Sequence, residues 1–215
     1  MSNFEYIIAS LPFLTQDYRY AEGKDFNAVI EEIRHSLSHA DNRQLDILLQ
    51  GFDESQLGTG FYAAALENKS AFLREYFRFD LNLRNEKVRF LNQELGRPEG
   101  TDILTGQGEE DDDKTDLEGY RFHPGEFDER DAVQEALSRK DLLERERALD
   151  DVVWDKISTL TLFDYFDLDA VLGYVAKLHI LDRWLSLDEQ TGREMFRRLV
   201  GEVKGTFQGV DFKDK

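Results

Sequence analysis

Two histidines four residues apart form the first group in the sequence whose spacing could bind a metal. His35 and His39 flank Ser-Leu-Ser, and residues at this spacing share one helix face, as in the zinc motif H-E-x-x-H. The glutamate of that motif is absent and no third ligand follows, whereas zinc sites use three or four protein ligands. The pattern favours two solvated histidines on one helix face, and we expect no metal and no cofactor.

A run of carboxylates in the middle of the chain, GEEDDDKTDLEG, has the composition of a calcium loop. An EF-hand needs oxygen ligands at its first, third and fifth loop positions, followed directly by a glycine. Counted from Asp111, the fifth position is Thr115 and the glycine position holds Asp116. Blocks of like charge repel and stay extended, which favours a solvated acidic segment over a specific calcium site.

Three further carboxylates, Asp164, Asp167 and Asp169, cluster in the segment FDYFDLDAV. Two carboxylates whose surroundings separate their pKa values can act as general acid and base. Aspartates directly before an apolar helical pattern also serve as N-caps, and we expect Asp169 to cap the helix that follows it. Since no phosphate loop, nucleophile elbow or dinucleotide fingerprint occurs, we expect no catalytic residues and keep a carboxylate-dependent hydrolase as an alternative.

The composition limits the classes of function. The 215 residues include 27 Lys and Arg against 45 Asp and Glu, a net charge of −18, and 40% are hydrophobic, enough for a folded core. Nucleic-acid binding needs a basic face, and an anionic membrane would repel this chain. Neither a basic secretory n-region nor an apolar stretch of about 18 residues occurs, and the chain has no cysteine. We expect a cytoplasmic protein without nucleic-acid partners and without direct membrane insertion.

Most of the excess negative charge is local. Between Glu99 and Asp131, 13 acidic residues stand against three basic ones, which gives −10 within 33 residues that have little apolar periodicity. Such a segment is typical of a long loop or disordered linker. The sequence therefore predicts one compact unit with these parts: an N-terminal helical half 1–98, an acidic linker 99–130, a C-terminal helical half 131–205 and a frayed tail 206–215.

Apolar residues recur at helical spacing on both sides of the acidic segment. The N-terminal half predicts a helix after Asp25, a short one after Asp41 closed by Gly51, and two or three more from Phe61 to the stop at Gly96-Arg97-Pro98. The C-terminal half predicts helices within 131–160, 169–181 and 188–203. Only FEYIIASL could also be a strand. We predict an all-α protein of seven to nine helices in two halves.

Three segments resemble known families. FEYIIASLPFL resembles the opening of an uncharacterised bacterial family whose genes lie among those of V-type ATPase subunits. LREYFRFDLNLRNEKVRFL resembles the V/A-type ATPase C-subunit family, homologous to the eukaryotic d subunit, with Phe79-Asp80 and Asn82-Leu83-Arg84 in place of its Tyr-Asp and Asn-Leu-Lys. FDLDAVLGYVAKLHILDRWLSLDEQTGREMFRRLV resembles the C-terminal helix pair of that family, with Leu172-Gly173-Tyr174 and Leu181-Asp182-Arg183 as the equivalents.

The resemblance implies a central-stalk role. Members of the C-subunit family are all-helical, funnel-like sockets that seat the rotor shaft on the membrane ring of proteolipid subunits, and they do no chemistry themselves. The protein would then be peripheral to the membrane through these partner subunits. Because the chain is shorter than the members of that family, the resemblance implies a lobe that is missing or reduced to the acidic segment.

The resemblance and the charge pattern also give candidate interface residues. Arg183, Arg193, Arg197 and Arg198 form the densest basic cluster of this acidic chain, and an acidic partner surface would fit them. The complete set is Asp80, Asn82, Arg84, Tyr174, Arg183, Arg193, Arg197 and Arg198. Besides the hydrolase, one alternative remains open: an acidic adaptor that binds a basic partner through the segment 99–131.

Overall fold

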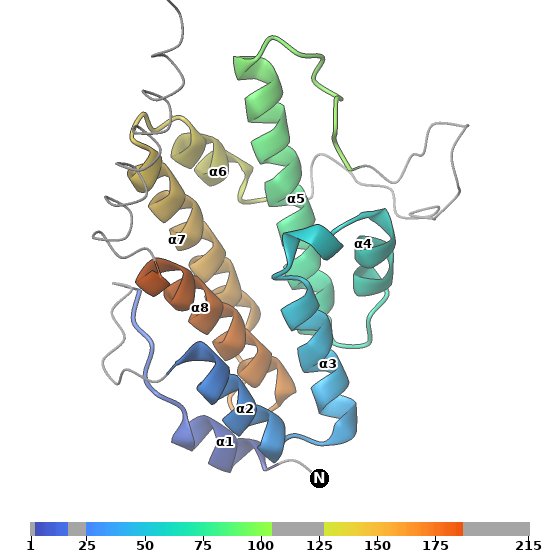
Figure 1. The fold of residues 1–215 in the computed structure, drawn as a ribbon, viewed down its shortest axis with the longest axis vertical. Helices are drawn as coiled ribbons and strands as arrows, with labels where there is room; N and C mark the ends of the chain where they lie inside the picture. Colours follow the sequence, from blue (N-terminus) through green and yellow to red (C-terminus); the bar gives the residue numbers. More distant parts are fainter. Residues whose placement is uncertain (1–2, 17–24, 105–126, 187–215) are drawn as a thin grey trace, which may run out of the picture.

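The fold is built from helices alone in the residues that the computed structural model describes, 3–16, 25–104 and 127–186 (Figure 1). This part of the chain has eight α-helices, one short 3-10 helix and no strand, which confirms the all-α prediction of seven to nine helices. The elements are α1 (Phe4–Ser10), α2 (Phe26–Ser36), α3 (His39–Gln50), η1 (Glu54–Gln56), α4 (Thr59–Leu66), α5 (Ala71–Glu94), α6 (Arg130–Leu137), α7 (Leu142–Leu160) and α8 (Leu168–Ser186).

Side-chain caps mark where several helices begin and end. The Ser70 hydroxyl accepts a hydrogen bond from the Leu73 amide at 3.1 Å, and the Asp141 carboxylate accepts one from the Glu144 amide at 2.9 Å. These caps satisfy amides that lack a partner in the first helical turn. α5 ends at Glu94, and two residues later Gly96 has a φ of 64°, a left-handed conformation that glycine adopts without strain. The predicted stop at this glycine is confirmed.

The predicted histidine pair is divided between two helices. α2 ends at Ser36, and Ser38 begins α3 by accepting a hydrogen bond from the Asp41 amide at 3.2 Å. His35 and His39 therefore do not share a helix face, and that part of the prediction is wrong because a new cap interrupts the apolar pattern. Within the described ranges, no group of three or more His, Asp or Glu residues could hold a metal ion.

Asp169 caps a different helix from the one predicted. α8 begins at Leu168, and its first turn is capped by Asp167, whose carboxylate accepts a hydrogen bond from the Ala170 amide at 2.9 Å. Asp169 instead accepts hydrogen bonds from the Ser70 hydroxyl at 2.9 Å and the Phe72 amide at 3.3 Å. Its carboxylate thus completes the N-terminus of α5, 97 residues away along the chain, and ties α8 to α5.

Helices from both sides of the acidic segment share one hydrophobic core. α8 contacts α1, α2, α3, α5 and α7, and Figure 1 shows α8 lying beside α7 and α2. Its buried apolar side chains are Val171, Leu172, Val175, Ala176, Leu178, Ile180 and Leu181. A second, smaller cluster joins Phe79 and Leu83 of α5 to α6, to the N-terminal part of α7 and to Phe127. α5 and α7 contribute to both clusters.

The described ends of the acidic segment are fastened to α5. The Asn92 amide donates a hydrogen bond to the Thr101 carbonyl at 2.7 Å, and Asn85 both donates to the Leu104 carbonyl and accepts from its amide, at 2.8 and 3.0 Å. At the other end, Phe127 is buried near Phe79. Residues 105–126, including the acidic run considered for calcium, lie outside the described residues.

None of the helices in the described ranges is long and apolar enough to cross a membrane.

α7 and α8 pack closely together at a glycine of α8, Gly173. A Cβ atom on Gly173 would lie 2.5 Å from Cγ2 of Thr161 and 3.4 Å from Cγ2 of Ile157. The Thr161 side chain has little freedom to move away, because its hydroxyl donates a hydrogen bond to the Ile157 carbonyl at 2.9 Å. The close approach fixes the N-terminal half of α8 against the end of α7.

We predict that Gly173→Ala destabilises the protein by about 1 kcal/mol or more in urea unfolding, because an overpacking cost of about 1–3 kcal/mol exceeds the gain in helix propensity. Thr161→Ser removes the opposing methyl group and keeps the hydroxyl, so the double variant Gly173→Ala, Thr161→Ser should recover most of the loss. Gly60→Ala in α4 is the matched control, since no atom lies within 4 Å of its added Cβ. Equal effects of Gly173→Ala and Gly60→Ala would contradict the prediction.

Candidate functional site

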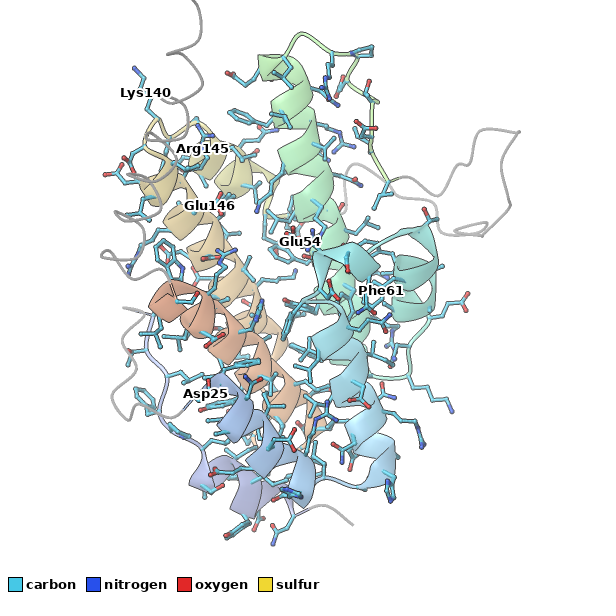
Figure 2. All side chains as sticks on the ribbon, in the orientation of Figure 1. Asp25, Glu54, Phe61, Lys140, Arg145 and Glu146 are labelled. Carbon is cyan, nitrogen blue, oxygen red and sulfur yellow. The ribbon has the colours of Figure 1, made fainter. Side chains whose placement is uncertain are left out.

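Asp80 and Arg84, two of the predicted interface residues, join α4 to α5. The Tyr62 hydroxyl and the Arg84 Nε both donate to Asp80 Oδ2, at 2.6 and 2.8 Å. Burial, with the Asp80 charge beside it, raises the pKa of Tyr62. Glu54 of η1 lies 3.8 Å from the Arg84 guanidinium (Figure 2). The Asp80 carboxylate therefore has two donors inside the protein.

Asn82 lies in the interior, and Tyr174 is half-buried. Asn82 is 2% exposed, and its Oδ1 has no hydrogen-bond donor among the described residues. Tyr174 of α8 donates its hydroxyl hydrogen to the Pro12 carbonyl at 2.9 Å. This bond holds the chain that follows α1 against α8, so both side chains take part in packing the helices together.

Arg183, near the end of α8, is paired with a buried carboxylate of α7. Its guanidinium and the Trp184 indole both donate to Asp150 Oδ2, the indole at 2.6 Å, and Glu146 lies 4.0 Å from the guanidinium (Figure 2). The Asp150 side chain is only 7% exposed, that of Arg183 44%. Burial raises the pKa of Asp150, although the charge of Arg183 and both hydrogen bonds lower it.

The described members of the predicted interface set thus each contact other helices or lie within the core. They link α4 to α5, α1 to α8, and α7 to α8. Their assignment to a partner interface stays a prediction, and Arg193, Arg197 and Arg198 lie outside the described residues. Among the described members, Asp80 and Arg84 form an ion pair with each other, whereas Tyr174 bonds to Pro12 and Arg183 to Asp150.

An exposed apolar surface lies at the connection between α7 and α8. We define the α7–α8 corner as Leu162, Phe163, Tyr165 and Phe166, which are 57–82% exposed, together with Phe13, which is 85% exposed. Single exposed apolar side chains are common, but adjacent large ones mark interaction surfaces. Sequence reasoning missed this surface because it considered only the aspartates of FDYFDLDAV. The signal was three aromatic residues between two helical patterns.

A groove of about 650 Å³ adjoins the corner. Its apolar walls include Leu11, Trp154 and Tyr174, with Tyr165 and Phe13 shared with the corner.

One cationic side chain also lines this groove. Lys177 Nζ lies 5.2 Å from the centre of the Trp154 ring, an arrangement that cation–π attraction favours. Burial lowers the pKa of Lys177, although the charge of Asp155 raises it. The groove therefore combines aromatic walls with a cation held at one side.

The three aspartates of the predicted carboxylate group border this corner. Asp167 and Asp169 accept the capping hydrogen bonds described above. Asp164 lines the groove, and its pKa is raised by loss of solvent and by its two acidic neighbours. The capping expected for two of these carboxylates is therefore found, but on two different helices.

A second hollow, of about 570 Å³, lies between the C-terminal part of α5 and α6. Its central charge is the buried carboxylate of Glu86, which accepts a hydrogen bond from Arg89 at 2.5 Å and lies 3.2 Å from Arg130 Nε. Both of these cations lie beside Glu86, and Arg97 and Glu99 also line the hollow, so charges of both signs border it. The α7–α8 corner is the better candidate for a functional surface.

His179 lies on α8 between two aromatic rings. Its ring is stacked on Phe52 with 3.9 Å between centroids, and Phe26 meets it edge-on at 6.0 Å. Burial, and secondarily the charge of Arg183, lowers the pKa of His179 to about 4. The imidazole is therefore neutral in the folded protein at neutral pH.

We predict that Arg183→Ala lowers the free energy of unfolding by about 1–3 kcal/mol at pH 7, because it leaves a buried carboxylate with one donor fewer. The loss should shrink at acidic pH, because burial raises the pKa of Asp150 and removal of the Arg183 charge raises it further. Lys140→Ala, an exposed cation before α7 (Figure 2), should change stability by less than about 0.5 kcal/mol. A purely interfacial role for Arg183 would instead leave the urea midpoint of the isolated protein unchanged.

We predict that His179 makes stability fall as the pH decreases from 6.5 to 4. In this window the unfolded chain binds a proton at His179 and the folded protein does not, at a cost of up to about 1.4 kcal/mol per pH unit. His179→Phe keeps an aromatic ring on Phe52 but does not titrate. Between pH 7 and pH 5, the stability of the wild type relative to this variant should fall by about 1–2 kcal/mol. A constant difference in urea unfolding would contradict the low pKa.

Comparison with known proteins places the chain in a family without an assigned role. No curated protein and no solved structure matches the sequence. One family model matches residues 53–206, which is 154 of the 215 residues and extends from the start of η1 beyond the end of α8. Since this match covers well over half of the chain, the protein belongs to the family described as "Protein of unknown function (DUF2764)".

Proposed function

We propose that the protein is a non-catalytic central-stalk subunit of a V/A-type ATPase, which couples the rotor shaft to the membrane ring of proteolipid subunits. The observation that carries the proposal is spatial. The three segments that carry the resemblance are far apart in sequence, yet the third packs against each of the other two within one hydrophobic core. They are represented here by α1 with its following residues, α5, and α8.

Specific contacts join these segments in pairs. The Tyr174 hydroxyl connects α8 to Pro12, at the end of the first segment. The Asp169 carboxylate connects α8 to the first turn of α5. Segments that form one packed unit are expected to diverge together, since a change in one alters the packing of the others. This supports treating the three resemblances as one.

The α7–α8 corner supplies the surface that such a protein needs. An accessory protein of this kind acts by holding partners, and interfaces are enriched in aromatic side chains at their centre. Exposed phenylalanines and a tyrosine beside an apolar groove fit this composition. In this proposal the corner contacts another component of the ATPase, and the protein stays in the cytoplasm, attached to the membrane through its partners.

The acidic adaptor remains the second proposal. It is favoured by the attachment of residues 99–104 and of Phe127 to the folded helices, because a segment fastened at both ends would be presented as one loop. Deletion of residues 105–118 separates the two proposals. It should abolish function in an adaptor and leave assembly into an ATPase almost unchanged.

We predict that the protein co-purifies with ATPase subunits from native membranes at low salt, and that the corner lies at the contact. The chain has no cysteine, so Phe163→Cys can be labelled at a single site with a photoreactive maleimide. Irradiation should crosslink this variant to one of the ATPase subunits, identified by mass spectrometry.

Leu143→Cys is the matched control, since Leu143 is 60% exposed near the start of α7. About 19 residues of mostly helical chain, at 1.5 Å per residue, place it roughly 28 Å from the corner. Repeated absence of ATPase subunits from the purified material would overturn the proposed function. Equal crosslinking of both variants to the same protein would contradict the prediction that the corner is the contact surface.

A further inference from the structure

The α7–α8 corner has two properties that together specify the chemistry of its partner. The first is apolar. Phe163, the most exposed side chain of the connection, projects into solvent beside a groove. The walls of this groove carry four aromatic rings, those of Phe13, Trp154, Tyr165 and Tyr174. A volume of about 650 Å³ lies within the range of about 300–1,000 Å³ found for ligand sites. The groove can therefore accept large apolar side chains.

The second property is an excess of negative charge. Asp164, Asp167 and Asp169 lie within six residues, and none of them forms an ion pair within 3–16, 25–104 or 127–186. The two caps face helix N-termini, whose partial positive charge compensates them in part. Asp164 is not one of these two caps. Loss of solvent raises its pKa, and so do the charges of Asp167 and Asp169 and a hydrogen bond with Asp167. A cation brought by a partner would relieve this repulsion.

We propose that the corner binds an amphipathic segment of a partner protein, with large apolar residues in the groove and Lys or Arg residues over Asp164 and Asp167. Lys177 fits this arrangement because it lies over the Trp154 ring and near Asp155, which compensates its charge. The basic residues of the partner would therefore face the Asp164 side of the groove. This inference rests on the corner being an interface, as in the proposed function, but not on the partner belonging to an ATPase.

Charge argues against two other occupants. A second copy in a symmetric dimer would bring the same patch against itself, so Asp164 and Asp167 would face their own equivalents. An anionic membrane would be repelled by the same carboxylates and by the net charge of −18. A partner segment that is both apolar and basic avoids both conflicts.

The test uses three synthetic 18-residue helical peptides and the purified full chain. The first peptide has Leu and Phe on one face and Lys on the other; the second has Glu in place of Lys; the third has Ser in place of Leu and Phe. Fluorescence anisotropy measures the Kd of each at two salt concentrations. We expect the first peptide to bind at least about tenfold more tightly than either of the others, and to weaken as salt increases.

Variants locate the binding site. Phe163→Ser and Asp164→Asn should each raise the Kd of the first peptide by about three- to tenfold, since each removes one anchor or one charge. Leu143→Ser and deletion of residues 105–118 are the matched controls and should leave the Kd within about twofold. Urea unfolding checks that the variants remain folded.

Binding that is lost on deletion of 105–118 and unchanged by Asp164→Asn would overturn the inference, because the peptide would then bind the acidic segment. Equal binding of the Lys and Glu peptides, or no binding of any, would overturn it as well. Sedimentation of the free protein as a dimer that Phe163→Ser dissociates would assign the corner to a second copy. Because the assay uses the isolated chain, its result is independent of co-purification with ATPase subunits.

Discussion

α8 is buried against five other helices, and this packing brings the two ends of the described chain into one core. A fully buried Leu, Ile or Val side chain contributes about 1.5–3 kcal/mol, and α8 buries several of them along its length. Three polar side chains then fix its position at successive points. Asp169 bonds to the start of α5, Tyr174 to Pro12 beyond α1, and Arg183 to Asp150 of α7. The sequence predicts another role for each of these three residues. In the fold, a polar side chain on a central helix instead forms hydrogen bonds with the neighbouring elements.

The α7–α8 corner is a consequence of that placement. Gly173 lets α8 approach Thr161, at the end of α7, closely. Asp167, which caps α8, follows Thr161 by only six residues. A connection this short cannot turn its side chains into a core already filled by both helices, so consecutive large residues are left at the surface. Natural surfaces rarely keep several adjacent aromatic side chains without a partner, because they favour nonspecific association. The corner is therefore a geometric result of the helix packing, and it carries five of the exposed large apolar side chains of the described residues.

The sequence predicted the helices well because their signal is local. Apolar residues at 3.6-residue spacing and the Gly96 stop depend only on near neighbours along the chain. The residues that a side chain contacts across the fold could not be predicted from such local patterns. Gly51 fits the pattern of a helix-closing glycine, yet its backbone is right-handed, and the absence of a side chain is required because a Cβ would lie 2.3 Å from the buried Phe77 ring. The same limit applied to the candidate site: Asp80 and Arg183 carry charges that a sequence can only assign to solvent or a partner, whereas the fold pairs them internally.

The carboxylates of the corner differ from several other carboxylates of the folded part in having no cation paired with them among the described residues. With 27 basic residues for 45 acidic ones, cations are scarce in this chain, and several of them pair with carboxylates that are shielded from water. Glu86 has Arg89 and Arg130, Asp150 has Arg183, and Glu129 has Lys156 at 2.7 Å. The aspartates of the α7–α8 connection have helix termini or only each other within the described residues. An unpaired carboxylate costs little while water solvates it, but a partner that covered the corner would remove that water, and the cost of desolvation would then have to be offset. A basic side chain on the partner provides that compensation, so a partner that covers this corner would supply a cation that residues 3–16, 25–104 and 127–186 do not pair with these aspartates.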